Sequence, residues 1–209
     1  MAKKNGTIEV TKDLGIIFRT LNRVGITDEE LVQALKLDAK LIEKAIELKL
    51  IKKCTEMNKE TRSPVTFYRI DKKGLRFQNN VLKKHAETKH MYKDSRMTIA
   101  GKQLSSNRHY GYQSYEHDIK IARYYTYNLT QKEKDSFINE TELREMFIDR
   151  FPNRKQELNH SISTTDFAYT KEGISEVSLV ESITSNYSEN ELQMKENFGE
   201  ALGASVEYI

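Results

Sequence analysis

Apolar residues recur at helical spacing near the start of the chain. Within residues 11–24 they are Leu14, Ile17, Phe18, Leu21 and Val24. These spacings place all five on one face of a helix. Gly25 follows directly and is typical of the left-handed cap that ends a helix. The pattern therefore predicts an amphipathic helix over residues 11–24.

Two further helices are predicted after a short break. Thr27-Asp28-Glu29-Glu30 has the form of a capping box, in which Thr27 caps the helix and Glu30 reaches back. After a turn at Lys36-Leu37, Asp38 is a second N-cap and begins a third helix. The residues expected to face inward from these two helices are Leu31, Val32, Leu35, Leu41, Ile42, Ala45, Ile46 and Leu48. Two helices joined by so tight a turn predict a helix-turn-helix.

A hairpin is predicted next, because two strand-like runs, 50–54 and 65–70, flank a polar segment. Cys54, the one cysteine of the chain, is expected to be a half-buried residue of the first strand. The polar segment carries Lys59 and Arg62 at its tip. Asp71 then begins a fourth helix, which runs towards His85.

The residues that follow the third helix carry a resemblance. The run from Ile46 to Gly74, with ELKLIKK before the hairpin and FYRIDKKG after it, resembles bacterial winged helix-turn-helix DNA-binding domains. It is also similar to the N-terminal module of plasmid and phage replication-relaxation proteins. The resemblance covers roughly residues 10–85. It implies that the third helix enters the major groove of double-stranded DNA and that the hairpin is the wing.

The charge distribution agrees with a nucleic-acid partner. Residues 1–109 carry 24 Lys and Arg against 13 Asp and Glu, whereas residues 110–209 carry 10 against 18. A basic half suggests a polyanion partner. The expected DNA-binding residues lie in the turn, on the outer face of the third helix and at the wing tip: Lys36, Lys40, Lys44, Lys59 and Arg62. A winged helix that binds a protein is the alternative, and Glu43 and Glu47 weaken the third helix as a purely phosphate-binding face.

The second half of the chain predicts a separate α/β domain. Residues 86–109 are polar and basic, and we expect a linker or an arm along the DNA backbone. Beyond it the patterns predict helices from Ser114 and over 138–145, strands over 165–169 and 175–184, a last helix around Phe198 and a closing strand over 204–209. The expected fold class is thus α+β, with a winged helix domain over 1–85 and an α/β domain over 110–209.

The order of these last elements resembles the restriction-endonuclease-like core. The resemblance implies that Glu142, Asp166 and Glu181 are the catalytic acids and that Asp166 and Glu181 hold Mg²⁺. The lysine that such nucleases carry two residues after the last acid is replaced by Ile183. Lys195, on the following helix, could supply its charge. A degenerate core used for dimerisation or for holding DNA, and an unrelated α/β domain with ordinary surface acids, are the alternatives.

Several function classes leave no signal. There is no Gly-rich phosphate loop, zinc-ligand spacing, nucleophile elbow or apolar run long enough for a membrane span. The winged-helix resemblance and the basic first half imply a protein that binds double-stranded DNA in transcription control, replication or plasmid transfer of a mobile element. We expect it to be cytoplasmic, with a C-terminal domain that forms a homodimer or recruits a partner. The rival function is a metal-dependent DNA endonuclease that the winged helix targets; no cofactor is expected otherwise.

Overall fold

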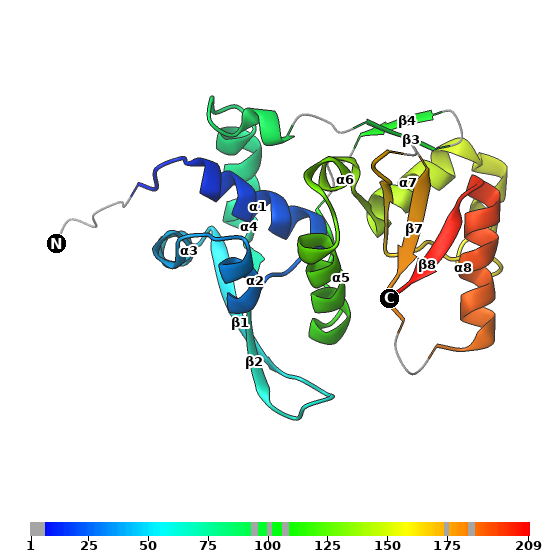
Figure 1. The fold of residues 1–209 in the computed structure, drawn as a ribbon, viewed down its shortest axis with the longest axis horizontal. Helices are drawn as coiled ribbons and strands as arrows, with labels where there is room; N and C mark the ends of the chain where they lie inside the picture. Colours follow the sequence, from blue (N-terminus) through cyan, green and yellow to red (C-terminus); the bar gives the residue numbers. More distant parts are fainter. Residues whose placement is uncertain (1–6, 93–95, 100–101, 106–108, 174–175, 184–186) are drawn as a thin grey trace. The chain divides into compact units, whose positions relative to one another are not determined.

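The computed structural model describes residues 7–92, 96–99, 102–105, 109–173, 176–183 and 187–209. The chain divides into two compact units, Met1–Lys93 and Asp94–Ile209. Within the described residues it is of the α+β class, as expected, with sheets of two, two and four strands (Figure 1). The ends of the predicted strand, 175 and 184, and parts of the predicted linker (93–95, 100–101 and 106–108) lie outside the described residues.

The first unit combines helices with one antiparallel hairpin. Its elements are α1 (Lys12–Val24), α2 (Glu29–Ala34), α3 (Ala39–Glu47), β1 (Ile51–Met57), β2 (Pro64–Ile70), α4 (Lys72–Phe77), the π-helix η1 (Gln78–Leu82) and the 3-10 helix η2 (Lys89–Tyr92). Thr11, Asp38 and Asp71 cap α1, α3 and α4 as their side chains accept backbone N–H groups. Gly25 ends α1 with a φ of 81°.

The start of α2 differs from the prediction. Asp28, not Thr27, is the N-cap, and its carboxylate accepts the N–H of Leu31 at 2.9 Å. Thr27 forms an isolated antiparallel bridge with Tyr68 of β2 instead. Its backbone N–H donates to the carbonyl oxygen of Tyr68 and its C=O accepts the N–H of Tyr68, so Thr27 pairs with one residue of the hairpin.

The core of the first unit lies between the helices and the base of the hairpin. Leu14, Phe18, Leu21 and Ala45 are fully buried in it. Gly74 allows α4 to lie close to Leu50, the residue before β1. A Cβ atom at position 74 would lie 1.9 Å from the carbonyl oxygen of Leu50. That oxygen also accepts the N–H of Asp71 at 3.0 Å, so the start of α4 and the start of β1 are in close backbone contact.

The second unit contains a two-stranded hairpin and a four-stranded sheet with helices. Its elements are β3 (Arg96–Ile99), β4 (Lys102–Ser105), α5 (Tyr115–Tyr127), α6 (Gln131–Ser136), β5 (Ile138–Asn139), α7 (Glu140–Arg150), the 3-10 helix η3 (Pro152–Glu157), β6 (Phe167–Thr170), β7 (Val177–Glu181), α8 (Glu189–Leu202) and β8 (Ser205–Tyr208). The expected linker, 86–109, thus contains η2 and the β3–β4 hairpin.

The four-stranded sheet has the order β5-β6-β7-β8. Its first three strands are antiparallel, whereas β8 runs parallel to β7 after the crossover through α8. Helices cover both faces. Tyr124 of α5 packs on Phe167, with ring centroids 5.6 Å apart, while Gly199 of α8 approaches Leu179, whose partner is Ala168. Since neighbouring residues of a strand point to opposite faces, α5 and α8 lie on opposite sides of the sheet.

The pattern over residues 138–145 predicts a helix throughout, and the structure corrects its start. Ile138 and Asn139 form the short strand β5, and α7 begins at Glu140. None of the described helices is both long enough and apolar enough to cross a membrane.

Candidate functional site

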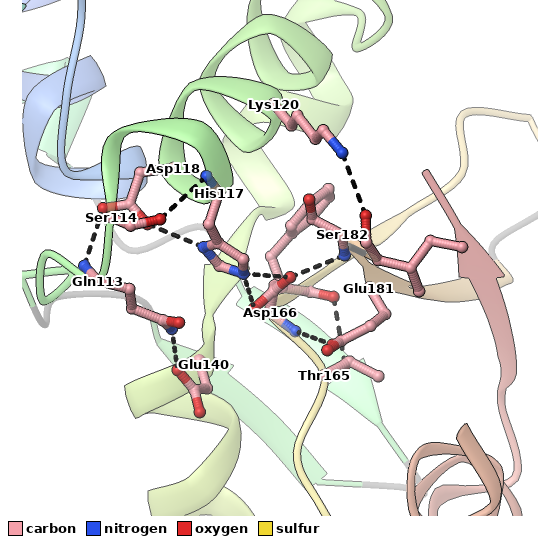
Figure 2. A network of polar contacts seen from close by, with 12 residues as sticks. Gln113, Ser114, His117, Asp118, Lys120, Glu140, Thr165, Asp166, Glu181 and Ser182 are labelled. Atoms are coloured by element: carbon pink, nitrogen blue, oxygen red, sulfur yellow. Dashed lines mark hydrogen bonds and ion pairs between the residues drawn. The ribbon is translucent and has the colours of Figure 1, made fainter. Parts of the chain in front are cut away.

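Asp166 and Glu181 meet at one end of the β6–β7 hairpin. The register pairs Phe167 of β6 with Val180 of β7, so Asp166 and Glu181 are the next pair of residues opposite each other. The N–H of Asp166 donates to Glu181 Oε2 at 3.0 Å, and the N–H of Ser182 donates to Asp166 Oδ2 at 2.8 Å. Both side chains are buried. The structure therefore brings together the two residues that the sequence predicts as metal ligands (Figure 2).

A histidine from α5 completes this arrangement. Ser114 caps α5 and orients its first turn, from which His117 reaches the sheet. His117 Nε2 lies 3.0 Å from Asp166 Oδ1, and His117 Nδ1 lies 2.9 Å from Asp118 Oδ1. Asp118 also accepts the N–H of Gln113 at 3.1 Å and the hydroxyl of Tyr110 at 3.3 Å. His117 is thus held between two buried carboxylates (Figure 2).

The lysine predicted on the last helix also reaches the cluster. Lys195 Nζ lies 2.7 Å from Glu181 Oε1 and donates to the carbonyl oxygen of Thr164 at 2.6 Å. Only 8% of Lys195 is exposed. The hydroxyl of Tyr187 donates to the same oxygen of Glu181. A displaced lysine beside Glu181 is what the sequence predicts, and Ile183 remains partly exposed at the usual position.

The helix acid differs from the prediction. Glu142 is the N3 residue of the capping box of α7, where its carboxylate accepts the N–H of Asn139 at 2.9 Å. Glu140, two residues earlier, takes part in the cluster instead. It accepts from Gln113 Nε2 at 3.0 Å and from the Thr164 hydroxyl at 3.4 Å. Residues two apart point in different directions from a helix, so both cannot face the same site.

The electrostatics of the cluster follow from its burial. Burial and the charge of Asp166 raise the pKa of Glu181 to about 7, against the opposing effect of Lys195. Burial and Asp166 also raise the pKa of Glu140. Burial tends to lower the pKa of His117, but the hydrogen bonds to Asp118 and Asp166 outweigh it and raise that pKa to about 10. At neutral pH the cluster therefore holds a cationic histidine.

The donor set does not fit a metal ion as it stands. Every oxygen of the Asp166 and Glu181 carboxylates already accepts from a donor of the chain. Over the part of the chain that the structure describes, no three His, Cys, Asp or Glu side chains are arranged to hold a metal. The presence of Mg²⁺ at Asp166 and Glu181 stays a prediction, and a metal would have to compete with His117 and Lys195.

The predicted DNA-binding residues lie on the surface of the first unit. Lys36 is exposed in the turn between α2 and α3, and Lys59 and Arg62 are exposed at the hairpin tip. The backbone of Lys36 and of Arg62 is left-handed, with φ of 54° and 53°. Such angles are unfavourable for a residue with a side chain, because Cβ crowds the following carbonyl.

The outer face of α3 carries the other two cations. Ile42 and Ala45 are buried, so Lys40, Glu43 and Glu47 point outward. Lys44 is half-buried and forms an ion pair with Glu47 at 2.9 Å. Lys40 is exposed on the first turn of the helix, where Asp38 caps the backbone. The face therefore offers mixed charge, with Lys40 and Lys44 separated by one helical turn.

The sequence does not predict His117, Asp118 and Glu140 as members of a site. The sequence signal for the first two is the adjacent His-Asp pair in the first turn of a helix with buried residues beyond it. In comparisons with protein-family models, with curated proteins and with solved structures, nothing matches this chain.

Proposed function

We propose that the protein binds double-stranded DNA through its first unit, with that unit acting as a winged helix. The observation that carries this proposal is the outward face of α3, where Lys40 and Lys44 lie on the side opposite the buried Ile42 and Ala45. An α-helix of this kind fits the major groove, where side chains reach base edges and flanking phosphates.

Two neighbouring features support the same partner. The β1–β2 hairpin extends beyond the core and carries exposed Lys59 and Arg62 at its tip, and Lys36 lies just before α3. Residues 1–93 hold 21 Lys and Arg against 12 Asp and Glu. Cations placed around a helix-turn-helix suit phosphate contacts on both sides of the groove. The resemblance to replication-relaxation proteins is the reason we look for the role in transcription control, replication or plasmid transfer.

The test is the affinity of a double variant, Lys40→Ala/Lys44→Ala, measured by fluorescence anisotropy at fixed salt. The DNA should be chosen by footprinting across the region that surrounds the protein's own gene. We expect the affinity to fall by roughly 1–3 kcal/mol or more. The charge-matched control is Lys132→Ala/Lys155→Ala, which removes two exposed cations from the second unit. Equal affinity of both double variants and the parent would show that α3 is not the DNA-reading helix.

One observation favours a second candidate function, metal-dependent DNA cleavage. Asp166, Glu181 and Lys195 converge, as the resemblance to the endonuclease core implies, and β8 returns parallel to β7 after α8. Supercoiled plasmid incubated with the protein and Mg²⁺ or Mn²⁺ tests it. Nicking that is absent from Asp166→Asn, which keeps an acceptor for the N–H of Ser182, would support this candidate, whereas intact plasmid with bound protein leaves DNA binding as the function.

A further inference from the structure

The acidic end of the β6–β7 hairpin receives one cation from each covering helix. His117 of α5 contacts Asp166 at 3.0 Å, and Lys195 of α8 contacts Glu181 at 2.7 Å. Because α5 and α8 lie on opposite sides of the sheet, the two cations approach the acid pair from different directions. Each of the two acids thus has its own partner within the second unit.

His117 acts as a cation on geometric grounds. Both ring nitrogens lie within 3.1 Å of carboxylate oxygens, Nδ1 beside Asp118 and Nε2 beside Asp166. A carboxylate oxygen accepts hydrogen bonds, so both nitrogens must carry a proton, and an imidazole with two N–H groups is positively charged. Lys195 Nζ lies 2.7 Å from Glu181 Oε1, so its ammonium group supplies the second cation of the cluster. The pair supplies two positive charges, the charge of one divalent cation.

Charged carboxylates with so little exposure need compensation. Glu181 and Asp118 are fully buried and Asp166 is 3% exposed. Asp166 and Glu181 lie side by side, so their two negative charges repel each other. Either a bound metal or side-chain cations can offset this repulsion. The structure provides side-chain cations at distances typical of strong ion pairs.

We propose that His117 and Lys195 take the place of a divalent cation at Asp166 and Glu181, so that the charges of these two carboxylates are balanced without metal. This inference goes beyond DNA binding and does not rest on it. It bears against the cleavage candidate, because the carboxylate oxygens that a metal would use are already occupied. Removing either internal cation should therefore uncover a cation site that the parent protein does not offer.

The experiment measures the melting temperature and heat of binding of the full chain with MnCl₂, for the parent, Lys195→Met, His117→Gln and a control. The control is Lys132→Met, which breaks the exposed Lys132–Glu172 ion pair. We expect the parent and the control to show no saturable Mn²⁺ binding up to about 5 mM. The two cluster variants should melt at a lower temperature than the parent. Mn²⁺ should raise their melting temperatures by about 4 °C or more.

A double variant covers the case in which Lys195→Met does not fold. Glu181→Gln/Lys195→Met removes both charges of the pair, so it should fold and be more stable than Lys195→Met. Its melting temperature should not change with Mn²⁺. Saturable Mn²⁺ stabilisation of the parent that disappears in Asp166→Asn would overturn the proposal. The proposal also fails if the folded cluster variants gain no response to Mn²⁺, or if the double variant is no more stable than Lys195→Met.

Discussion

The backbone N–H of Asp166 donates to the carboxylate of Glu181, while the carboxylate of Asp166 accepts the N–H of Ser182, the residue that follows Glu181. Each acidic side chain thereby satisfies a backbone donor on the opposite strand, where the regular ladder of β6 and β7 has ended. The acids that the sequence predicts as catalytic also fasten the end of a hairpin. Substitutions at these positions consequently change stability as well as charge.

Asp166→Ala should destabilise the protein more than Asp166→Asn. Alanine leaves the N–H of Ser182 and the Nε2–H of His117 buried without an acceptor, for which we expect a loss of about 3 kcal/mol or more. Asparagine keeps one oxygen that can accept the N–H of Ser182, so Asp166→Asn should lose less stability. Urea unfolding measures both variants, with the exposed Asp149→Ala as the reference for an ordinary acid. Equal losses for the two Asp166 variants would mean that the carboxylate contacts contribute little.

The stability of the parent should fall as the pH rises from about 7 to about 10. The pKa of His117 is about 10 in the folded protein and 6.5 ordinarily, so between these values the folded state holds a proton that the unfolded state has released. This contribution is complete below pH 6.5 and is lost as the pH approaches 10, by on the order of 1 kcal/mol per pH unit.

The control for this pH dependence is His117→Gln, which cannot titrate. Its free energy of unfolding should be lower at pH 7 and should change less between pH 7 and 9.5 than that of the parent. Chemical denaturation at closely spaced pH values provides the slopes. Parallel slopes for the two proteins would contradict a raised pKa at His117.

Gly74→Ala should destabilise the first unit severely. The added methyl group would lie 1.9 Å from the carbonyl oxygen of Leu50, and this is a backbone atom that already accepts from Asp71. Relief requires α4 to move away from Leu50, at a loss of roughly 3 kcal/mol or more. Gly111→Ala is the matched control, because nothing lies within 4 Å of a Cβ atom there. Thermal melts of both variants decide the comparison.

Lys36→Gly/Arg62→Gly should separate DNA affinity from stability. Both residues have left-handed backbones that glycine adopts freely, so we expect stability to be unchanged or to rise by about 1 kcal/mol. DNA affinity should nevertheless fall, and the slope of its logarithm against log salt should decrease by about two if both cations contact phosphate.

Asn159→Gly is the reference for this variant. Its φ is 68°, so glycine replaces another residue with a left-handed backbone, in the second unit, without removing a charge; it removes only the exposed acceptor of Arg144. It should match the parent in DNA affinity and in salt slope. An equal loss of affinity in Asn159→Gly would indicate that the effect in the first unit is not one of charge.

The parts of the fold that the sequence predicts well are those with local causes. Asp38, Asp71 and Ser114, which the sequence places at the starts of helices, cap them because the capping bond forms within three residues. The same rule predicts Thr27 as a cap, but its bridge to Tyr68 is a contact between distant residues. Ile138 and Asn139 likewise pair with Ala168 and Phe167, and a two-residue strand has no period of its own to detect.

The candidate site divides in the same way. Asp166, Glu181 and Lys195 could be predicted because their order along the chain resembles a known core, including the lysine displaced to the last helix. The presence of His117 in the site depends on the packing of α5 beside Asp166, which lies 49 residues later in the sequence. The choice of Glu140 over Glu142 depends on where α7 begins, since that start makes Glu142 the N3 residue of a capping box. Boundaries of elements are the least certain part of a sequence prediction.

The parallel pairing of β7 with β8 has a consequence for the order in which the chain folds. Ser178 meets Ser205 only after the intervening helix has crossed the sheet, whereas Met57 and Pro64 of the first hairpin meet across a short turn. Closing the longer loop has a larger entropy cost, and contacts of high sequence separation slow folding. During synthesis we therefore expect the hairpin of the first unit to form early, and β8 to join its sheet as one of the last events. A truncation before β8 should leave β7 with an open edge available to other chains.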